Sequence, residues 1–205
     1  MGWYRERIVP HIVNWACATP GMERWREQVC EGLHGDVVEI GFGSGLNVAH
    51  YPDAVQRVYA VEPSGRSLQI GAKRISDARV PVEHVGLDGQ SLPLDDASCD
   101  CALVTFTLCT VPDPDLALRE LRRVLKPGGT LHFLEHGTAP DPRTARWQRI
   151  LDPLEQRLAD GCHLTRDTPA LITDVGFEIT WLEQRFARGP KPWSYFSVGV
   201  AVSPS

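Results

Sequence analysis

The stretch Val38-Glu39-Ile40-Gly41-Phe42-Gly43-Ser44-Gly45 decides the fold of this chain. An apolar run of β type ends here in three glycines at alternate positions, which let the backbone turn sharply and approach a ligand without a Cβ in the way. Such a loop after a first strand is typical of nucleotide-like ligand sites in parallel sheets. The dinucleotide fingerprint G-x-G-x-x-G is not met, because Leu46 stands where its third glycine belongs. The loop therefore predicts a nucleotide-like ligand without the dinucleotide pattern.

Strand-like and helix-like segments alternate around this loop. Helical spacing and the capping residues Ser64 and Asp113 predict helices over Ser64–Ser76 and Asp113–Leu125. Repeated strand–helix–strand units form parallel sheets with right-handed crossovers and helices on both faces. The strands predicted from short apolar runs are Asp36–Ile40, Arg57–Glu62, Val80–Gly86, Asp100–Phe106 and Thr130–Glu135.

The order of elements changes after the fifth predicted strand. Helices are expected at about Pro142–Asp160 and Thr168–Val175, and two further strands at about Phe177–Gln184 and Trp193–Val202. The segment between these two strands is too short for a parallel crossover, so they must pair as an antiparallel hairpin. The sequence thus predicts one α/β fold in which a parallel sheet ends in a hairpin.

Composition and charge limit the classes of function. The chain has 205 residues, of which 42% are hydrophobic and 23% charged, and a formal net charge of −5. These values favour one globular domain and disfavour a nucleic-acid partner. The six cysteines show neither a C-x-x-C pair nor the Cys/His spacing of a zinc site, so no metal is expected. Without a signal peptide or an apolar span in the sequence, we expect a cytoplasmic protein.

Two carboxylates follow the second and third predicted strands. Glu62 can accept hydrogen bonds from both ribose hydroxyls of an adenosine-type cofactor, and Pro63 turns the chain beside it. Asp88 can accept from an adenine amino group, while the backbone N–H of Gly89 can donate to a ring nitrogen. The alternatives are a surface glutamate at a strand end and an aspartate that stabilises its own turn. A third acid, Glu39, stands two residues before the first glycine of the loop and strengthens the pattern.

Together these features resemble the class I S-adenosylmethionine-dependent methyltransferases. The resemblance runs from about Asp36 to Gly137 and includes the glycine loop, the D-G-x-x-L-P turn at Asp88 and the run Glu120–Gly129. The last of these is similar to the ubiquinone and menaquinone methyltransferases. The resemblance implies a Rossmann-like, seven-stranded and mostly parallel sheet of order 3-2-1-4-5-7-6, with strand 7 antiparallel and helices on both faces. It also implies S-adenosylmethionine as the cofactor and S-adenosylhomocysteine as its product.

A finer resemblance extends into the carboxyl-terminal half. Thr107–Val111, Phe133–His136, Leu151–Pro153 and Asp160–Arg166 resemble segments of the thiol S-methyltransferases, which act on alkyl thiols and hydrogen sulfide. The animal members carry an amino-terminal hydrophobic anchor that this sequence does not show, which implies a soluble relative of bacterial type. This resemblance favours a thiol as the methyl acceptor.

The residues before the first strand, 1–35, are expected to form an amino-terminal helical cap on a single methyltransferase domain, 36–205. Within them, Trp3–Cys17 mixes aromatic, aliphatic and charged residues. In class I enzymes such a segment often covers the acceptor pocket. A substrate lid, ordinary core packing and a peripheral membrane contact all remain open for it.

Methyl transfer from a sulfonium is an in-line displacement, so the protein has mainly to align donor and acceptor and exclude water. His136, at the end of the fifth predicted strand, is the first candidate to accept a proton from the acceptor, and Asp88 is the second. A structural histidine that caps a loop is the alternative for His136. The predicted cofactor-binding residues are Glu39, Gly41, Gly43, Gly45, Glu62, Pro63, Asp88, Gly89, Thr105 and Cys109.

The segment Asp160–Arg166 lies between two predicted helices. It is expected either to close over the cofactor or substrate as a lid, or to form a turn with Gly161 as a C-cap and Thr165 as the next N-cap. The predicted substrate-binding residues are Tyr4, His136, Cys162, His163 and Arg166.

Other functions stay open at this point. One is O- or C-methylation of a quinone or phenolic metabolite, and another is cofactor binding without catalysis. An NAD-dependent oxidoreductase is disfavoured by Leu46 and by the closing hairpin. The expected partner is a small-molecule acceptor, and the expected assembly is a monomer or a homodimer.

Overall fold

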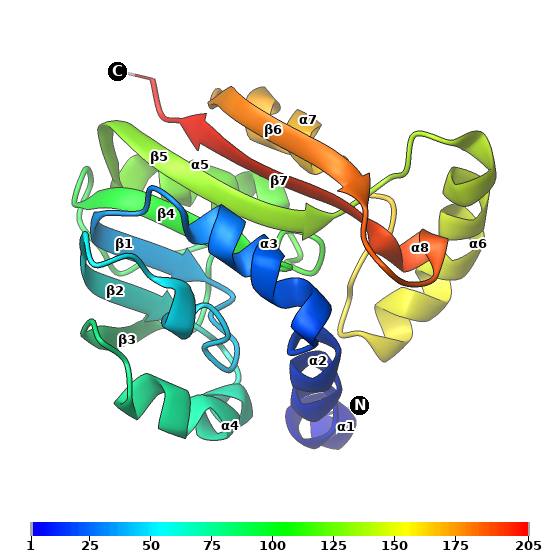
Figure 1. Cartoon of the computed structure of the whole chain (residues 1–205), viewed down its shortest axis with the longest axis horizontal. Helices are drawn as coiled ribbons and strands as arrows, with labels where there is room; N and C mark the ends of the chain where they lie inside the picture. Colours follow the sequence, from blue (N-terminus) through cyan, green and yellow to red (C-terminus); the bar gives the residue numbers. More distant parts are fainter. Residues whose placement is uncertain (1, 205) are drawn as a thin grey trace.

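The centre of the molecule is a seven-stranded sheet of order β3-β2-β1-β4-β5-β7-β6 (Figure 1). The structure is a computed structural model that describes residues 2–204. The first five strands run parallel, and β7 pairs antiparallel with both β5 and β6. The predicted strand order and the closing hairpin are therefore confirmed. The strands are β1 (Gly35–Ile40), β2 (Val55–Val61), β3 (Val82–Gly86), β4 (Cys99–Thr105), β5 (Leu125–His136), β6 (Glu178–Phe186) and β7 (Tyr195–Val202).

Helices cover both faces of the sheet, and Figure 1 shows α5 and α7 behind it and α3 in front. Leu118 of α5 and Ile172 of α7 pack in one buried cluster. Trp25 and Val29 of α3 pack in a second buried cluster with residues of β1 and β2. The helices are α1 (Gly2–Arg7), α2 (Val9–Cys17), α3 (Pro20–Cys30), α4 (Gly65–Ser76), α5 (Pro114–Val124), α6 (Pro142–Leu158), α7 (Thr168–Asp174) and α8 (Lys191–Ser194), with a 3₁₀ turn η1 (Val48–His50).

Strand β4 shows why the sequences of the central strands are almost continuously apolar. Six of its seven residues are buried, since helices lie on both sides of the sheet. Two of its cysteines, Cys99 and Cys101, are fully buried free thiols that pack as small apolar residues.

Side-chain caps start several helices. Ser64 accepts a hydrogen bond from the backbone N–H of Ser67 and starts α4, and Asp113 starts α5 in the same way, as the sequence predicts. The expectation that Thr165 caps α7 is wrong, because Asp167 accepts the bond from the Ala170 N–H and occupies that position.

Several strand ends differ from the prediction by one to five residues, and three of them change the hairpin and its neighbour. Strand β5 begins at Leu125, because that residue pairs with Cys99 before the glycine turn. Strand β6 continues to Phe186, which pairs with Tyr195. Trp193 lies in the short helix α8 and not in the last strand.

The parallel strands end at one edge of the sheet. Ile40 pairs with both Val61 and Val104, and Val61 pairs with Gly86, so the chain leaves β1 to β4 at about the same level. The turns after these strands therefore meet there, which is where ligands bind in open parallel sheets. Among residues 2–204, no helix is both long enough and apolar enough to cross a membrane.

Candidate active site

A cavity of about 830 Å³ lies at the carboxyl edge of the sheet. Its walls come from α2, from the turns after β1, β2, β3 and β4, and from the segment that joins α6 to α7. Ligand sites for cofactors and drug-sized molecules have volumes of about 300–1,000 Å³. The cavity can therefore hold a nucleotide-sized ligand together with part of a small second molecule.

The glycine loop after β1 forms the floor of the cavity. Gly41 has φ of +68°, and a Cβ at this position would lie 1.9 Å from Oγ1 of Thr107, so only glycine fits. Gly43 donates its backbone N–H to Glu62 at 2.7 Å. Gly41 and Gly43 line the cavity, whereas Gly45 lies outside its wall, where an added Cβ would come within 3.1 Å of Phe42 and Val48.

Glu62 links the turns after β1 and β2. Its side chain lines the cavity, and its two carboxylate oxygens accept backbone N–H groups from Gly43 and Ser64, the latter at 2.8 Å. Burial raises the pKa of Glu62, and the two N–H donors oppose that shift. A carboxylate has about four acceptor sites, so both oxygens keep capacity for further donors in the cavity.

Asp88 and Gly89 line the cavity from the turn after β3. Asp88 is exposed, and its Oδ1 accepts the backbone N–H of Gln90 at 2.9 Å, which is an Asx turn. The sequence left two roles open for Asp88, adenine binding or stabilising its own turn. The turn is present, and it places the carboxylate at the cavity wall.

A buried polar network supports the glycine loop from below. Glu39, which is 1% exposed, lies behind the loop and not in the cavity wall, where it accepts hydrogen bonds from Nδ2 of Asn47 and the hydroxyl of Tyr51. Asn47 also donates to Oγ1 of Thr105, a residue that lines the cavity. Burial raises the pKa of Glu39 to about 7, although the donors from Tyr51 and Asn47 lower it.

Arg26 of α3 completes this network and was not foreseen from the sequence. It is 4% exposed, lines the cavity and donates to Oδ1 of Asn47 at 2.6 Å. Its position in the helix could have identified Arg26 from the sequence. Met22, Trp25 and Val29 form the buried stripe of α3 at helical spacing, and Arg26 lies within that stripe. A cation on the apolar face of a helix is costly unless it is paired.

Helices α2 and α4 contact the glycine loop directly. Asn14 of α2 accepts a hydrogen bond from the hydroxyl of Ser44 at 2.7 Å. Arg74 of α4 donates to the backbone carbonyl of Ser44 at 2.9 Å. Tyr4, predicted to bind substrate, lies outside the cavity wall and donates its hydroxyl to the carbonyl of Leu158.

The turn after β4 is held by a buried carboxylate. Glu135 is fully buried and accepts the backbone N–H groups of Thr107, Leu108 and Cys109 at 2.6, 2.9 and 3.3 Å. Phe106 has φ of +53°, a strained conformation for a residue with a side chain, and its ring lines the cavity. The three bonds to Glu135 fix the turn that this conformation starts.

The segment that joins α6 to α7 covers the cavity from the opposite side. Asp152 of α6 accepts the backbone N–H of Leu164 at 2.6 Å and the hydroxyl of Thr165. Arg166 donates to the carbonyls of Leu108 and Val111, which ties the segment to the turn after β4. Arg166 and His163 line the cavity, so the segment is both an interhelical turn and a cover.

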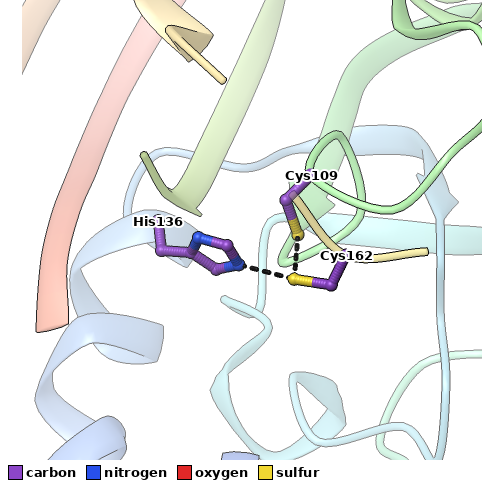
Figure 2. Close-up of side chains that lie close together, drawn as sticks. All are labelled: Cys109, His136 and Cys162. Atoms are coloured by element: carbon purple, nitrogen blue, oxygen red, sulfur yellow. Dashed lines mark hydrogen bonds between the residues drawn. The ribbon is translucent and has the colours of Figure 1, made fainter. Parts of the chain in front are cut away.

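Three of the predicted site residues meet in a cluster behind the cavity wall (Figure 2). The sulfur of Cys162 lies 2.9 Å from Nε2 of His136 and 3.7 Å from the sulfur of Cys109. The His136 ring stacks on Phe106, with ring centroids 6.4 Å apart. Sequence spacing gave no sign of this cluster, because the residues come from the turn after β4, the end of β5 and the segment after α6.

The cluster has perturbed pKa values. The hydrogen bond from Cys162, opposed by burial and supported by His136, lowers the pKa of Cys109 well below its usual value. The same hydrogen bond, with burial, raises the pKa of Cys162. Burial lowers the pKa of His136, but the charge of the Cys109 sulfur and the hydrogen bond to it, together with nearby carboxylates, outweigh burial and raise the pKa. The arrangement therefore favours one thiolate and one imidazolium in close contact.

The comparisons with known proteins agree with this geometry. Residues 38–133 match the methyltransferase domain family. The thiol S-methyltransferase TMT1B of Rattus norvegicus is 35% identical over 170 residues, which cover 81% of this chain and 68% of the rat protein. A demethylmenaquinone methyltransferase of Clavibacter sepedonicus is 36% identical over 111 residues, which cover 54% of this chain and 44% of that protein.

A solved structure has the same fold over almost the whole chain. The S-adenosylmethionine-dependent methyltransferase from Thermotoga maritima, described as a possible histamine N-methyltransferase, has a TM-score of 0.69 and 25% identity, covering 97% of both chains. The cofactor implied by the sequence is thus confirmed as S-adenosylmethionine. The glycine loop, the strand order and these likenesses lead to one conclusion: the chain belongs to the class I S-adenosylmethionine-dependent methyltransferases.

Proposed function

We propose that this chain transfers a methyl group from S-adenosylmethionine to a small thiol. The observation that carries the proposal is the 35% identity to a thiol S-methyltransferase over 81% of the chain. The cavity supports it, because the turn after β4 contributes Phe106 and Val111, and the covering segment contributes His163 and Arg166. An apolar wall suits an alkyl chain, and a nearby cation favours the thiolate form of an acceptor.

The residues present fit the cofactor. Glu62 is buried at the cavity wall and keeps acceptor sites beyond its two backbone donors, so it would hold the ribose hydroxyls. Asp88 and the Gly89 N–H would contact the adenine. Arg26 supplies a buried positive charge for the carboxylate of the methionine part. Bound S-adenosylmethionine supplies a methyl group on a sulfonium, which is already activated for transfer.

The chain's own task is to position the acceptor and exclude water. The segment 159–166 and α2 close two sides of the cavity, and the segment is pinned by Asp152 and Arg166. A thiol has a pKa of about 8.5, so a modest shift is enough to give a large reactive fraction near neutral pH. We therefore assign no obligatory general base. His136 does not line the cavity and contacts Cys162 behind its wall, so it has no direct contact with the acceptor, and Asp88 would bind the cofactor.

The proposal is tested with purified protein, labelled S-adenosylmethionine and a panel of acceptors: an alkyl thiol, sulfide, a phenol and a reduced quinone. We expect label in the thiol products. The Glu62→Ala variant should lose activity toward every acceptor that the native chain methylates, which shows that the activity belongs to this chain. Methylation of the phenol or quinol without methylation of any thiol would contradict the proposal.

A second candidate is methylation of a quinone precursor. It is favoured by the likeness to demethylmenaquinone methyltransferases, one of which is 36% identical over 111 residues. The same panel separates the two candidates, because only the quinol arm would then carry label.

A further inference from the structure

The cluster of Cys109, His136 and Cys162 has no direct part in the proposed methyl transfer. Its side chains stay behind the cavity wall, while their neighbours Thr110 and Gly161 line the cavity. One ligand-type atom from each residue lies within 4.8 Å of the other two. Within residues 2–204 this is the one group of three histidine, cysteine or acidic side chains so arranged. Figure 2 shows the three side chains pointing at one another.

We propose that Cys109, His136 and Cys162 form a binding site for one thiophilic divalent metal ion, with Zn²⁺ as the ion of choice. Two thiolates and an imidazole are a donor set that zinc prefers. Three protein ligands also leave a fourth position for water or another small ligand. The inference stands apart from the nature of the methyl acceptor, because it concerns metal binding alone.

The distance between the two sulfurs fits a tetrahedral ion closely. With Zn–S bonds of about 2.3 Å, two sulfurs on one tetrahedral ion lie roughly 3.8 Å apart. The sulfurs of Cys109 and Cys162 are 3.7 Å apart. A sulfur and a nitrogen on the same ion lie about 3.5 Å apart, and Cys162 and His136 are 2.9 Å apart. The imidazole therefore has to move back by about half an ångström, which a side-chain rotation provides.

The backbone around the cluster is fixed, so the ligands are held in place without the ion. The Cys109 N–H is bound by Glu135, and the carbonyl of Cys109 accepts the backbone N–H of His163 at 2.8 Å. The second bond joins the two cysteine-bearing segments directly. Ligands carried by rigid elements keep a metal site pre-formed and raise its affinity.

The surroundings select a soft ion over a hard one. Glu135 is a buried carboxylate that contacts the backbone of Cys109, and both of its oxygens already accept backbone N–H groups. Magnesium and calcium require several oxygen ligands, which the cluster does not offer. Cys109 and Cys162 are 1% and 8% exposed, so bulk water does not compete strongly for the ion.

Cobalt(II) is the probe for this site, because thiolate-bound cobalt absorbs strongly and replaces zinc in the same geometry. Protein kept in a non-thiol reductant and freed of metal by a chelator is titrated with Co²⁺. We expect a thiolate-to-cobalt band that saturates at one equivalent and is displaced by Zn²⁺. Absence of such a band, or saturation at several equivalents, would overturn the proposal.

Variants assign the ligands. Cys109→Ser, Cys162→Ser and His136→Gln should each weaken Co²⁺ binding at least tenfold. Cys99→Ser is the matched control, because Cys99 is an equally buried free thiol outside the cluster, and it should bind Co²⁺ as the native chain does. Unchanged affinity in the three cluster variants would place the metal elsewhere and refute the site.

A measurement on the native chain tests the site even if the variants do not fold. Alkylation by iodoacetamide followed by mass spectrometry reports each cysteine separately. Zn²⁺ should slow alkylation of Cys109 and Cys162 at least tenfold and leave that of the half-buried Cys17 unchanged. Equal rates at Cys109 and Cys162 with and without Zn²⁺ would refute the proposal even if the variants fail to fold.

Discussion

The two halves of the cavity are built in different ways. The half made by the turns after β1 and β2 depends on contacts between neighbouring strands, such as Gly43 with Glu62. The half made by the turn after β4 and the segment 159–166 depends on contacts between distant parts of the chain, such as Arg166 with Leu108. The first half is therefore encoded in local spacing, while the second exists only after the carboxyl-terminal helices have packed.

The largest expected effect tests the steric basis of the first half. Gly41→Ala should destabilise the fold by about 3–4 kcal/mol, because the new Cβ would meet Oγ1 of Thr107 at 1.9 Å and the positive φ adds strain. Urea unfolding measures the loss. Gly128→Ala is the control, since Gly128 has φ of +78° with nothing within 4 Å, and it should lose only about 1 kcal/mol. Equal losses in both variants would show that the Thr107 contact is unimportant.

The second-largest expected effect is a pH dependence of stability, which comes from Glu39 in the network beneath the loop. The folded-state pKa of Glu39 is about 7, above its usual value of 4.5, so the folded chain binds more protons than the unfolded one between these values. Its contribution to stability therefore falls as pH rises from 4.5 through 7 and stays low above. Glu39→Gln carries no titrating group at this position and should not show this loss. The free energy of unfolding of Glu39→Gln, relative to that of the native chain, should therefore rise by about 2–3 kcal/mol from pH 5 to pH 8.

Urea unfolding at both pH values checks this expectation. Glu178→Gln serves as the control, because Glu178 is exposed at the start of β6. A constant difference between Glu39→Gln and the native chain at the two pH values would contradict the raised pKa.

Cofactor affinity tests the link between β1 and β2. Glu62→Ala should weaken binding of S-adenosylmethionine by about 1–3 kcal/mol, the loss expected when hydrogen bonds to a charged group are removed. Calorimetry measures it, with the exposed Glu83→Ala of β3 as the control. Unchanged affinity in Glu62→Ala would show that this carboxylate does not hold the ribose.

The second half is tested at Asp152, which holds the segment after α6. Asp152→Ala leaves the Leu164 N–H without its acceptor and should cost about 1–2 kcal/mol. Hydrogen exchange should rise in 160–166 but not in the glycine loop. Asp174→Ala, at an exposed position of α7, should change neither region. Faster exchange in the glycine loop of Asp152→Ala would mean that the two halves are not built independently.

Asp88 carries the smallest expected effect. Its side chain is exposed and already used in an Asx turn, so Asp88→Asn should weaken cofactor binding by less than about 1 kcal/mol. Calorimetry checks this value beside that of Glu62→Ala. A larger loss at Asp88 than at Glu62 would invert the ranking of the two carboxylates.

Much of the fold could be predicted because its signals are local. The period and length of the apolar runs gave the strands, and the short turn before β7 required the hairpin. The helix boundary at Thr165 was wrong because Asp167, two residues later, is an equally good cap and only packing decides between them.

The site could be predicted in part for the same reason. Gly41, Gly43, Glu62 and Asp88 follow strands directly, so strand order alone brings them to one edge. Arg26 is fixed by tertiary contacts, and so is the cluster behind the wall, whose members come from three separate segments. Residue spacing along the chain cannot predict such tertiary contacts.

The contact between Asn14 and Ser44 has a consequence for kinetic order. Because Asn14 on α2 accepts from the hydroxyl of Ser44 in the glycine loop, the amino-terminal helix and the loop are joined by a direct hydrogen bond. A ligand that contacts the loop therefore also acts on the wall formed by α2, against which we expect the second ligand to bind. We expect an ordered reaction in which the cofactor enters first and the methylated product leaves before S-adenosylhomocysteine.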